Sequence, residues 1–303
     1  MDHAWAILAL ALAGIPGLHA QDLTPRAYLI TPVGSHAVIL SSSFSRGDIV
    51  LDPSVPIENA KGSIEVPVIG YYESFDLSGH SANVTLVVPY AHALFQGTYQ
   101  GEAGEITRSG LADLRVRFSV NLAGGRAMNV GEYVKWKEKR LVGVSLTMSI
   151  PTGQYDSARI VSIGTNRWGF KPEVGLTRRW NRWALDAYGG VWFFTANNQY
   201  SPGSSLRTQS VVGSVEGHWG YYFRPRLWAS LDVNFWTGGR TAVNGVEKPD
   251  QQRDSRVGGT VSVPINRHQA VKLSYNQGAY ITVGGAYRTL AVGWQYSWIS
   301  APQ

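Results

Sequence analysis

The sequence predicts an all-β protein, an antiparallel transmembrane β-barrel of about 12 strands. Apolar and polar residues alternate along many segments, as they do in strands with one apolar and one polar face. The joints between these segments alternate between short and long, as in outer-membrane barrels. Aromatic residues gather at segment ends, around Trp180, Trp219 and Trp298, where interfacial girdles are expected.

The chain is expected to begin with a signal peptide over residues 1–20. The apolar run from Trp5 to Ile15 is too short to span a membrane, and Leu18-His-Ala offers a cleavage site. No lysine or arginine precedes the run, so a buried N-terminal helix is the alternative. Residues 21–36 are then a periplasmic lead-in, and residues 37–303 form the outer-membrane barrel.

Twelve segments are long enough for tilted strands, which need about 9–11 residues to cross a bilayer. In the segment 226–238, Leu231 and Val233 are expected to face lipid and Asp232 the lumen. A soluble β-sandwich would alternate in the same way, but the joint lengths and the aromatic ends favour the barrel. The predicted strands cover residues 37–45, 63–75, 80–90, 110–122, 141–151, 168–180, 183–195, 208–222, 226–238, 255–266, 269–279 and 287–298.

The connections predict the orientation of the barrel, because outer-membrane barrels have long outer loops and short periplasmic turns. The short joints are 76–79, 181–182, 223–225 and 267–268, and the long ones include 91–109, 196–207 and 239–254. The segment 123–140 should be short and is not. It is expected to hold a small amphipathic periplasmic helix, or else the strand count is wrong there.

Composition excludes several classes of protein. The chain has no cysteine, which suits passage through an oxidising periplasm. After the N-terminus it has no apolar run of about 20 residues, so helical membrane spans are not expected. The net charge is +6, but the basic residues are scattered and no basic helix occurs, so nucleic acid is not an expected partner.

Five segments carry a family resemblance: residues 21–28, 51–60, 108–122, 151–156 and 164–173. Among them are Pro151-Thr-Gly-Gln-Tyr-Asp and Gly164-Thr-Asn-Arg-Trp-Gly-Phe-Lys-Pro-Glu. With these the chain resembles the outer-membrane transporter family named for the meta-pathway of phenol degradation. The resemblance implies an outer-membrane barrel and the transport of phenol-like compounds.

Charged and aromatic residues on the predicted lumen faces are the candidates for a pore lining or solute site. Opposite charges on neighbouring strands would equally brace the wall, and the aromatic rings would either stack on a solute or fill space. Trp228 and Trp236 are predicted to flank Asp232, an arrangement that suits a phenol. The candidates are Arg115, Arg117, Lys171, Glu173, Asp186, Tyr188, Trp192, Glu216, His218, Trp228, Asp232 and Trp236.

Catalysis is not expected. An outer-membrane lipid hydrolase would need a serine beside a histidine and an acid, and His218 with Ser210 or Ser214 and Glu216 or Asp232 is the best local set. No Gly-x-Ser-x-Gly elbow accompanies it. The histidines show no metal-binding spacing, so neither a metal nor a cofactor is expected.

The expected function is passive diffusion of small hydrophobic or aromatic compounds across a bacterial outer membrane. Outer-membrane lipid, the barrel-assembly machinery and the solute are the expected partners. The alternative is a structural or adhesive barrel with a closed lumen.

Overall fold

Twelve long antiparallel strands close into a barrel in the computed structural model, which describes residues 23–51, 57–159, 161–200 and 205–300. The ring closes because β1 (Ser35–Val50) pairs with β17 (Gly284–Ile299) from Ser35↔Ile299 to Val50↔Gly284. All twelve predicted strands are confirmed. Between β1 and β17 the ring contains β2 (Glu58–Leu77), β3 (His80–Tyr99), β5 (Leu114–Ala123), β6 (Arg140–Ile150), β7 (Gly169–Trp180), β8 (Trp183–Phe194), β11 (Val212–Arg224), β12 (Leu227–Gly238), β15 (Gln252–Pro264) and β16 (Gln269–Tyr280).

The strand faces follow the sequence alternation. On β12, Leu231 is 68% exposed on the outer surface, whereas Asp232 beside it is 1% exposed on the inner face. Apolar residues such as Val215 on β11 and Val174 on β7 are likewise exposed on the outside of the barrel. A closed barrel with an apolar outer surface satisfies its backbone hydrogen bonds internally, as a bilayer requires. The protein is an outer-membrane β-barrel. Among the described residues, no helix is both long and apolar enough to cross a membrane.

A charged side chain on the outer face of the barrel should destabilise the protein, because that face contacts lipid. Leu231→Arg should lower the free energy of unfolding from a bilayer by about 2–4 kcal/mol if the residue lies near the midplane. Thr85→Arg is the matched control, because Thr85 lines the cavity inside the barrel, where an arginine stays in water. Urea titration of the vesicle-inserted protein measures both. Equal losses from the two changes would contradict the assignment of the faces.

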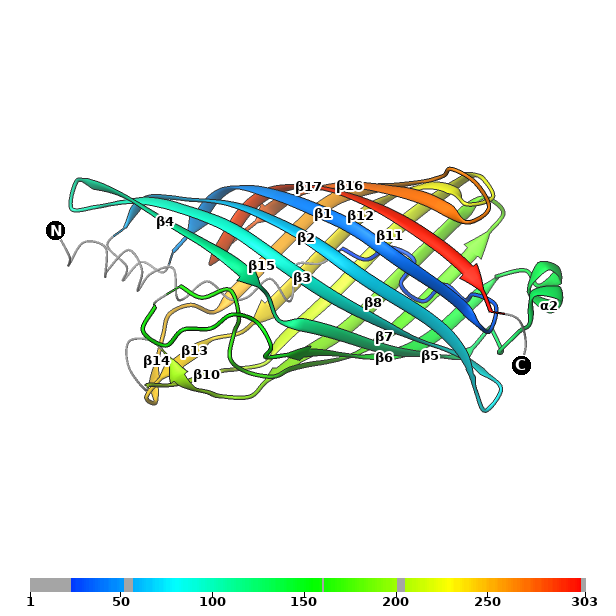
Figure 1. Cartoon of the computed structure of the whole chain (residues 1–303), viewed down its shortest axis with the longest axis horizontal. Coiled ribbons are helices and arrows are strands. Elements are labelled where there is room, and N and C mark those ends of the chain that lie inside the picture. The colour runs from blue at the N-terminus through cyan, green and yellow to red at the C-terminus, as the bar shows by residue number, and fades with distance from the viewer. Residues whose placement is uncertain (1–22, 52–56, 160, 201–204, 301–303) are drawn as a thin grey trace.

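The two ends of the barrel differ, as Figure 1 shows. One end carries α2 (Val130–Lys135), the start of β1 and the short joints 78–79, 181–182, 225–226 and 265–268; we call it the turn end. The other, the loop end, carries the longer connections. Aromatic side chains cluster at the turn end, where the Trp183 ring lies 5.4 Å from Trp219 and 4.7 Å from Tyr221. Such a cluster matches an interfacial girdle.

The predicted small helix is confirmed as α2. Asn129 caps it by accepting a hydrogen bond from the Glu132 amide at 2.9 Å, and the Glu132 carboxylate accepts one from the Asn129 amide at 3.2 Å. These reciprocal bonds form a capping box. Next to the helix, Met128 and Leu141 pack on Ile30 of the N-terminal segment, with Tyr133 and Trp136 against them.

Three of the predicted loops contain additional strands. Residues 91–109 were expected to be a loop, which is wrong: β3 continues through them and turns at Gln100–Gly101 into β4 (Glu102–Leu111), a hairpin that projects beyond the ring at the loop end (Figure 1). Both turn residues have positive φ, 49° and 82°, as tight hairpin turns require. In the joints 196–207 and 239–254, a small separate sheet forms from β9 (Asn197–Tyr200), β10 (Ser205–Gln209), β13 (Thr241–Val243) and β14 (Val246–Glu247).

The N-terminal residues also differ from expectation. The predicted signal peptide, residues 1–20, lies outside the described residues. The expected periplasmic lead-in extends into the barrel, where Figure 1 shows it as the dark-blue trace between the walls near the turn end. We call residues 23–34 the N-terminal plug.

Candidate functional site

The N-terminal plug occupies part of the lumen. Tyr28 and Ile30 are each 1% exposed, although they belong to a segment with neither helix nor strand. Their burial arises from contacts with residues far along the chain. The plug is therefore part of the folded interior.

Arg26 fixes one end of the plug. Its guanidinium donates to Asp186 on β8 at 3.1 Å and to Glu138, which lies between α2 and β6. Its backbone amide also donates to Asp186, at 3.2 Å. Because all three groups are buried, removing one of them would leave a charge in the interior without its partner.

Tyr28 fixes the middle of the plug in a niche of the wall. Gly143 on β6 and Gly175 on β7 are direct ladder partners, and a Cβ on either one would collide with the Tyr28 ring. The Tyr28 hydroxyl lies 2.9 Å from the Ser145 hydroxyl and donates to Glu173 at 3.1 Å. Burial, and secondarily the nearby Glu173 carboxylate, raises the pKa of Tyr28 to about 12. The hydroxyl therefore stays protonated and able to donate at neutral pH.

The plug lies on a wall of paired charges. Arg117 stacks over the Tyr28 ring at 4.6 Å and donates to the Ala27 carbonyl at 3.0 Å. Lys171 bridges Glu173 at 2.6 Å and Glu216 at 3.3 Å. The sequence analysis predicted that opposite charges on neighbouring strands would brace the wall. The pairs found here are of that kind, and they also hold the plug.

Asp232 is the centre of a second polar cluster on this wall. It accepts hydrogen bonds from the Ser230 and Thr260 hydroxyls, at 2.8 and 2.7 Å, and its other close contact is His218 Nδ1 at 2.9 Å. His218 Nε2 faces Glu216 at 3.5 Å. Both carboxylate oxygens of Asp232 are occupied within the protein, so Asp232 is not an open acceptor for a phenol hydroxyl.

The predicted pair of tryptophans around Asp232 does not form one site. Trp228 lies at the turn end with Tyr222, whereas Trp236 is fully buried in a loop-end cluster with Trp192 and Val212. The two tryptophans are eight residues apart on one strand, about 26 Å, so one small solute does not contact both. The hypothesis that they flank a solute is wrong because the strand separates them by most of the membrane thickness.

The other predicted residues fall into groups by their place in the barrel. Arg117, Lys171, Glu173, Asp186, Tyr188, Glu216 and His218 lie at or beside the plug, and Arg115 and Trp228 line the adjoining cavity. Sequence reasoning did not place Arg26 and Tyr28 in the lumen. The excess of buried carboxylates on β7, β8 and β11 was the available signal that a cation from elsewhere must join them.

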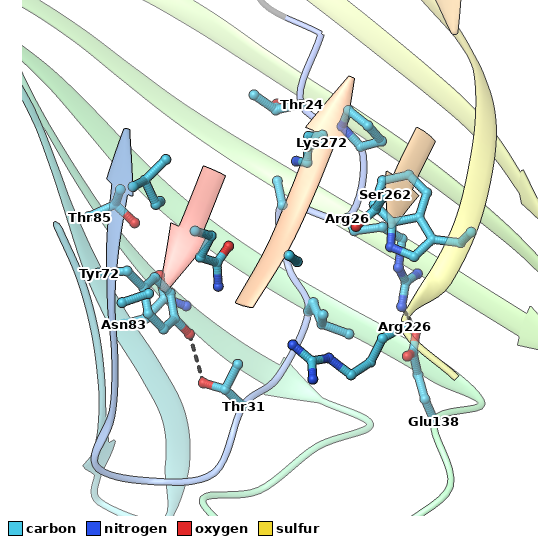
Figure 2. Close-up of a pocket in the computed structure, with 18 of the residues that line it drawn as sticks. Thr24, Arg26, Thr31, Tyr72, Asn83, Thr85, Glu138, Arg226, Ser262 and Lys272 are labelled. Carbon is cyan, nitrogen blue, oxygen red and sulfur yellow. Dashed lines mark hydrogen bonds and ion pairs between the residues drawn. The ribbon is translucent and has the colours of Figure 1, made fainter. Parts of the chain in front are cut away.

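A cavity of about 1360 Å³ remains beside the plug. Figure 2 shows Thr24, Arg26 and Thr31 of the plug running through this pocket, with Tyr72, Asn83 and Thr85 at one side. The Thr31 hydroxyl lies 2.8 Å from the Tyr72 hydroxyl, so the plug is also attached to β2. Apolar residues of β1 to β3, among them Ile39, Val68 and Val87, line the wall there.

The candidate catalytic set around His218 does not have the geometry of a serine hydrolase. Among the described residues, no serine hydroxyl hydrogen-bonds His218, whose two ring nitrogens face Asp232 and Glu216. Ser230 donates to Asp232. A serine nucleophile needs the base within hydrogen-bond reach.

Solved structures share this architecture. An outer membrane channel of Pseudomonas putida F1 superposes with a TM-score of 0.77 at 15% identity, covering 91% of this chain and 100% of that chain. The transport unit of the Escherichia coli autotransporter AIDA-I gives 0.52 at 9% identity, covering 99% and 98% of the two chains. The β domain of the Bordetella autotransporter BrkA gives 0.51 at 14% identity, covering 87% and 100%. At these identities the likeness shows the fold alone.

Comparison with curated proteins gives no match. Residues 53–296, most of the chain, match the family described as "Putative MetA-pathway of phenol degradation". The chain therefore belongs to the family of the MetA-pathway of phenol degradation.

Proposed function

We propose that the protein is an outer-membrane channel through which small aromatic or hydrophobic compounds such as phenol diffuse passively. The observation that carries the proposal is the cavity of about 1360 Å³ inside a barrel whose lumen is otherwise occupied by the plug. Small-molecule sites are concave, largely apolar and fitted with a few polar groups. Here the rings of Tyr72, Trp136 and Trp228 and the aliphatic side chains of β1 to β3 supply the apolar surface.

The plug sets the solute size. With Arg26 and Tyr28 seated, a solute passes only along the free wall, and displacement of the plug widens the path. The contacts that seat the plug are hydrogen bonds and ion pairs to the barrel, so no covalent change is needed to move it. The protein acts without chemistry on the solute and without a cofactor.

The loop end faces the outside of the cell in this proposal, and the turn end faces the periplasm, as in other outer-membrane barrels. Residues 1–20 serve as the export signal. The barrel-assembly machinery inserts the chain, and the apolar outer surface contacts membrane lipid. The Pseudomonas putida channel shares the barrel fold on which this orientation is based.

Influx into vesicles with a lipopolysaccharide outer leaflet tests the function. That leaflet is needed because phenol crosses plain phospholipid unaided. We expect vesicles containing the protein to take up labelled phenol several-fold faster than protein-free vesicles, with much less acceleration for glucose. Equal uptake with and without folded protein would instead support the closed structural barrel.

A further inference from the structure

The wall of the cavity formed by β12, β15, β16 and β17 carries hydrogen-bond donors that the plug does not use. Lys272 on β16 lies directly opposite Ser262 on β15, and Ser262 lies opposite Trp228 on β12. Gln295 on β17 lies opposite Ala270, two residues from Lys272. Side chains directly opposite each other in a sheet are about 5 Å apart. All of these residues line the cavity, and Figure 2 shows Lys272 and Ser262 in the same pocket as Thr24 and Arg26.

These donors have no acceptor in the described part of the protein. The Lys272 ammonium lies 5.8 Å from the centre of the Trp228 ring, and no carboxylate of a described residue is within ion-pair distance of it. The Asp232 carboxylate on β12 attracts Lys272 through space from beyond ion-pair distance, but its oxygens already accept hydrogen bonds from Ser230 and Thr260 and contact His218. Neither the Ser262 hydroxyl nor the Gln295 amide hydrogen-bonds a described side chain.

The cavity as a whole attracts anions. Eight of its lining residues are basic and two are acidic. Both acidic residues are already paired, Glu138 with Arg26 and Arg179 and Glu173 with Lys171 and Arg117. Neither lining carboxylate pairs with Lys272 or with the turn-end residues Arg182, Arg224 and Arg226, and their positive charge raises the local concentration of anionic solutes.

We propose that Lys272, Ser262, Gln295 and Trp228 form a binding subsite for the carboxylate of a small aromatic acid. The proposal rests on the channel function above and adds a solute class to it. A carboxylate brings two charged oxygens, which accept charge-assisted hydrogen bonds from the ammonium and a neighbouring hydroxyl or amide. The ring then lies against the Trp228 indole and Ala270, where offset stacking and apolar contact are available. A phenol hydroxyl supplies one neutral acceptor, so it satisfies fewer of these donors.

The subsite stays available while the plug is seated. Arg26 and Tyr28 are fixed to β6, β7 and β8 and to the segment before β6, whereas the subsite lies on β12 and β15 to β17. A solute held there would lie beside the plug.

Equilibrium dialysis of labelled benzoate against the full-length barrel folded in detergent tests the subsite independently of transport. Lys272→Met should weaken benzoate binding by about tenfold, the loss expected for one charge-assisted contact. Lys272→Arg should retain most of the affinity, and Ser262→Ala should lose less than Lys272→Met. Lys248→Met, at an exposed loop lysine, is the matched control and should bind as the wild type does. A shift in gel migration on heating shows that each variant is folded. If Lys272→Met does not fold, the two single variants Lys272→Arg and Ser262→Ala still test the subsite.

Competition defines the ligand. Unlabelled benzoate should displace the label well. Benzyl alcohol, which lacks the carboxylate, and acetate, which lacks the ring, should displace it poorly.

Unchanged benzoate affinity in Lys272→Met, or absence of benzoate binding to the wild type, would overturn the subsite. If acetate competed as well as benzoate, the proposed contact between the aromatic ring and Trp228 would be overturned. If phenol influx is accelerated in the vesicle assay while benzoate binding ignores Lys272, the channel stands and the subsite fails. If benzoate binds as described but phenol influx is not accelerated, the channel fails.

Discussion

A barrel that carries Arg26→Ala together with Tyr28→Ala is expected to conduct ions several-fold better than the wild-type barrel. The two substitutions remove the hydrogen bonds to Asp186, Glu138 and Glu173 and empty the niche at Gly143 and Gly175. The plug then loses its buried ion pairs and the ring that fills the niche, and it keeps only weaker contacts such as those of Ala27 and Thr31, so water enters the space. A 12-stranded barrel is wider than an eight-stranded one, whose side chains fill the interior, so a freed lumen conducts.

Single-channel recording in planar bilayers measures this effect. Thr24→Ala is the control within the plug, because the Thr24 hydroxyl makes a single 3.4 Å contact with Glu216. It should leave the conductance near that of the wild type. If the double variant folds and still conducts like the wild type, the plug is not the barrier in the lumen.

Asp232→Ala should be the most destabilising substitution in the wall, lowering the free energy of unfolding by about 3–5 kcal/mol. It removes the carboxylate that contacts His218 Nδ1 and accepts from Ser230 and Thr260, all in the buried interior. Asp156→Ala is the control, since Asp156 pairs with Arg159 in an exposed ion pair. Exposed pairs contribute about 0–1 kcal/mol. Urea unfolding in the same lipid compares the two, and similar small losses would show that the Asp232 cluster does not stabilise the barrel.

The barrel was predictable because its information is local. Alternation along 226–238 assigns Leu231 to lipid and Asp232 to the lumen without any knowledge of neighbouring strands. The two-residue turn at Asn181–Arg182 was also evident from the sequence, because it separates two alternating segments. The β3–β4 hairpin was missed although Gln100–Gly101 offers a turn, because the joint-length rule favoured a loop there.

The plug was not predictable in the same way. Arg26 and Asp186 are 160 residues apart, and no periodicity in residues 21–36 indicates where that segment goes. Alternation indicates which side chains of a strand face the lumen, but it does not indicate how deep in the membrane each of the twelve candidate residues lies. Trp228 and Trp236 were therefore joined into one site although they lie at opposite ends of β12.

The most direct test of passage through the lumen uses the absence of cysteine from the chain. Thr85→Cys places a single thiol in the cavity, and Leu86→Cys places one on the outer face of the same strand. Phenol influx into vesicles with a lipopolysaccharide leaflet is measured before and after a bulky thiol reagent is attached. We predict that modification at position 85 reduces influx to the protein-free rate and modification at position 86 does not. Undiminished influx through the modified Thr85→Cys barrel would contradict diffusion through the lumen.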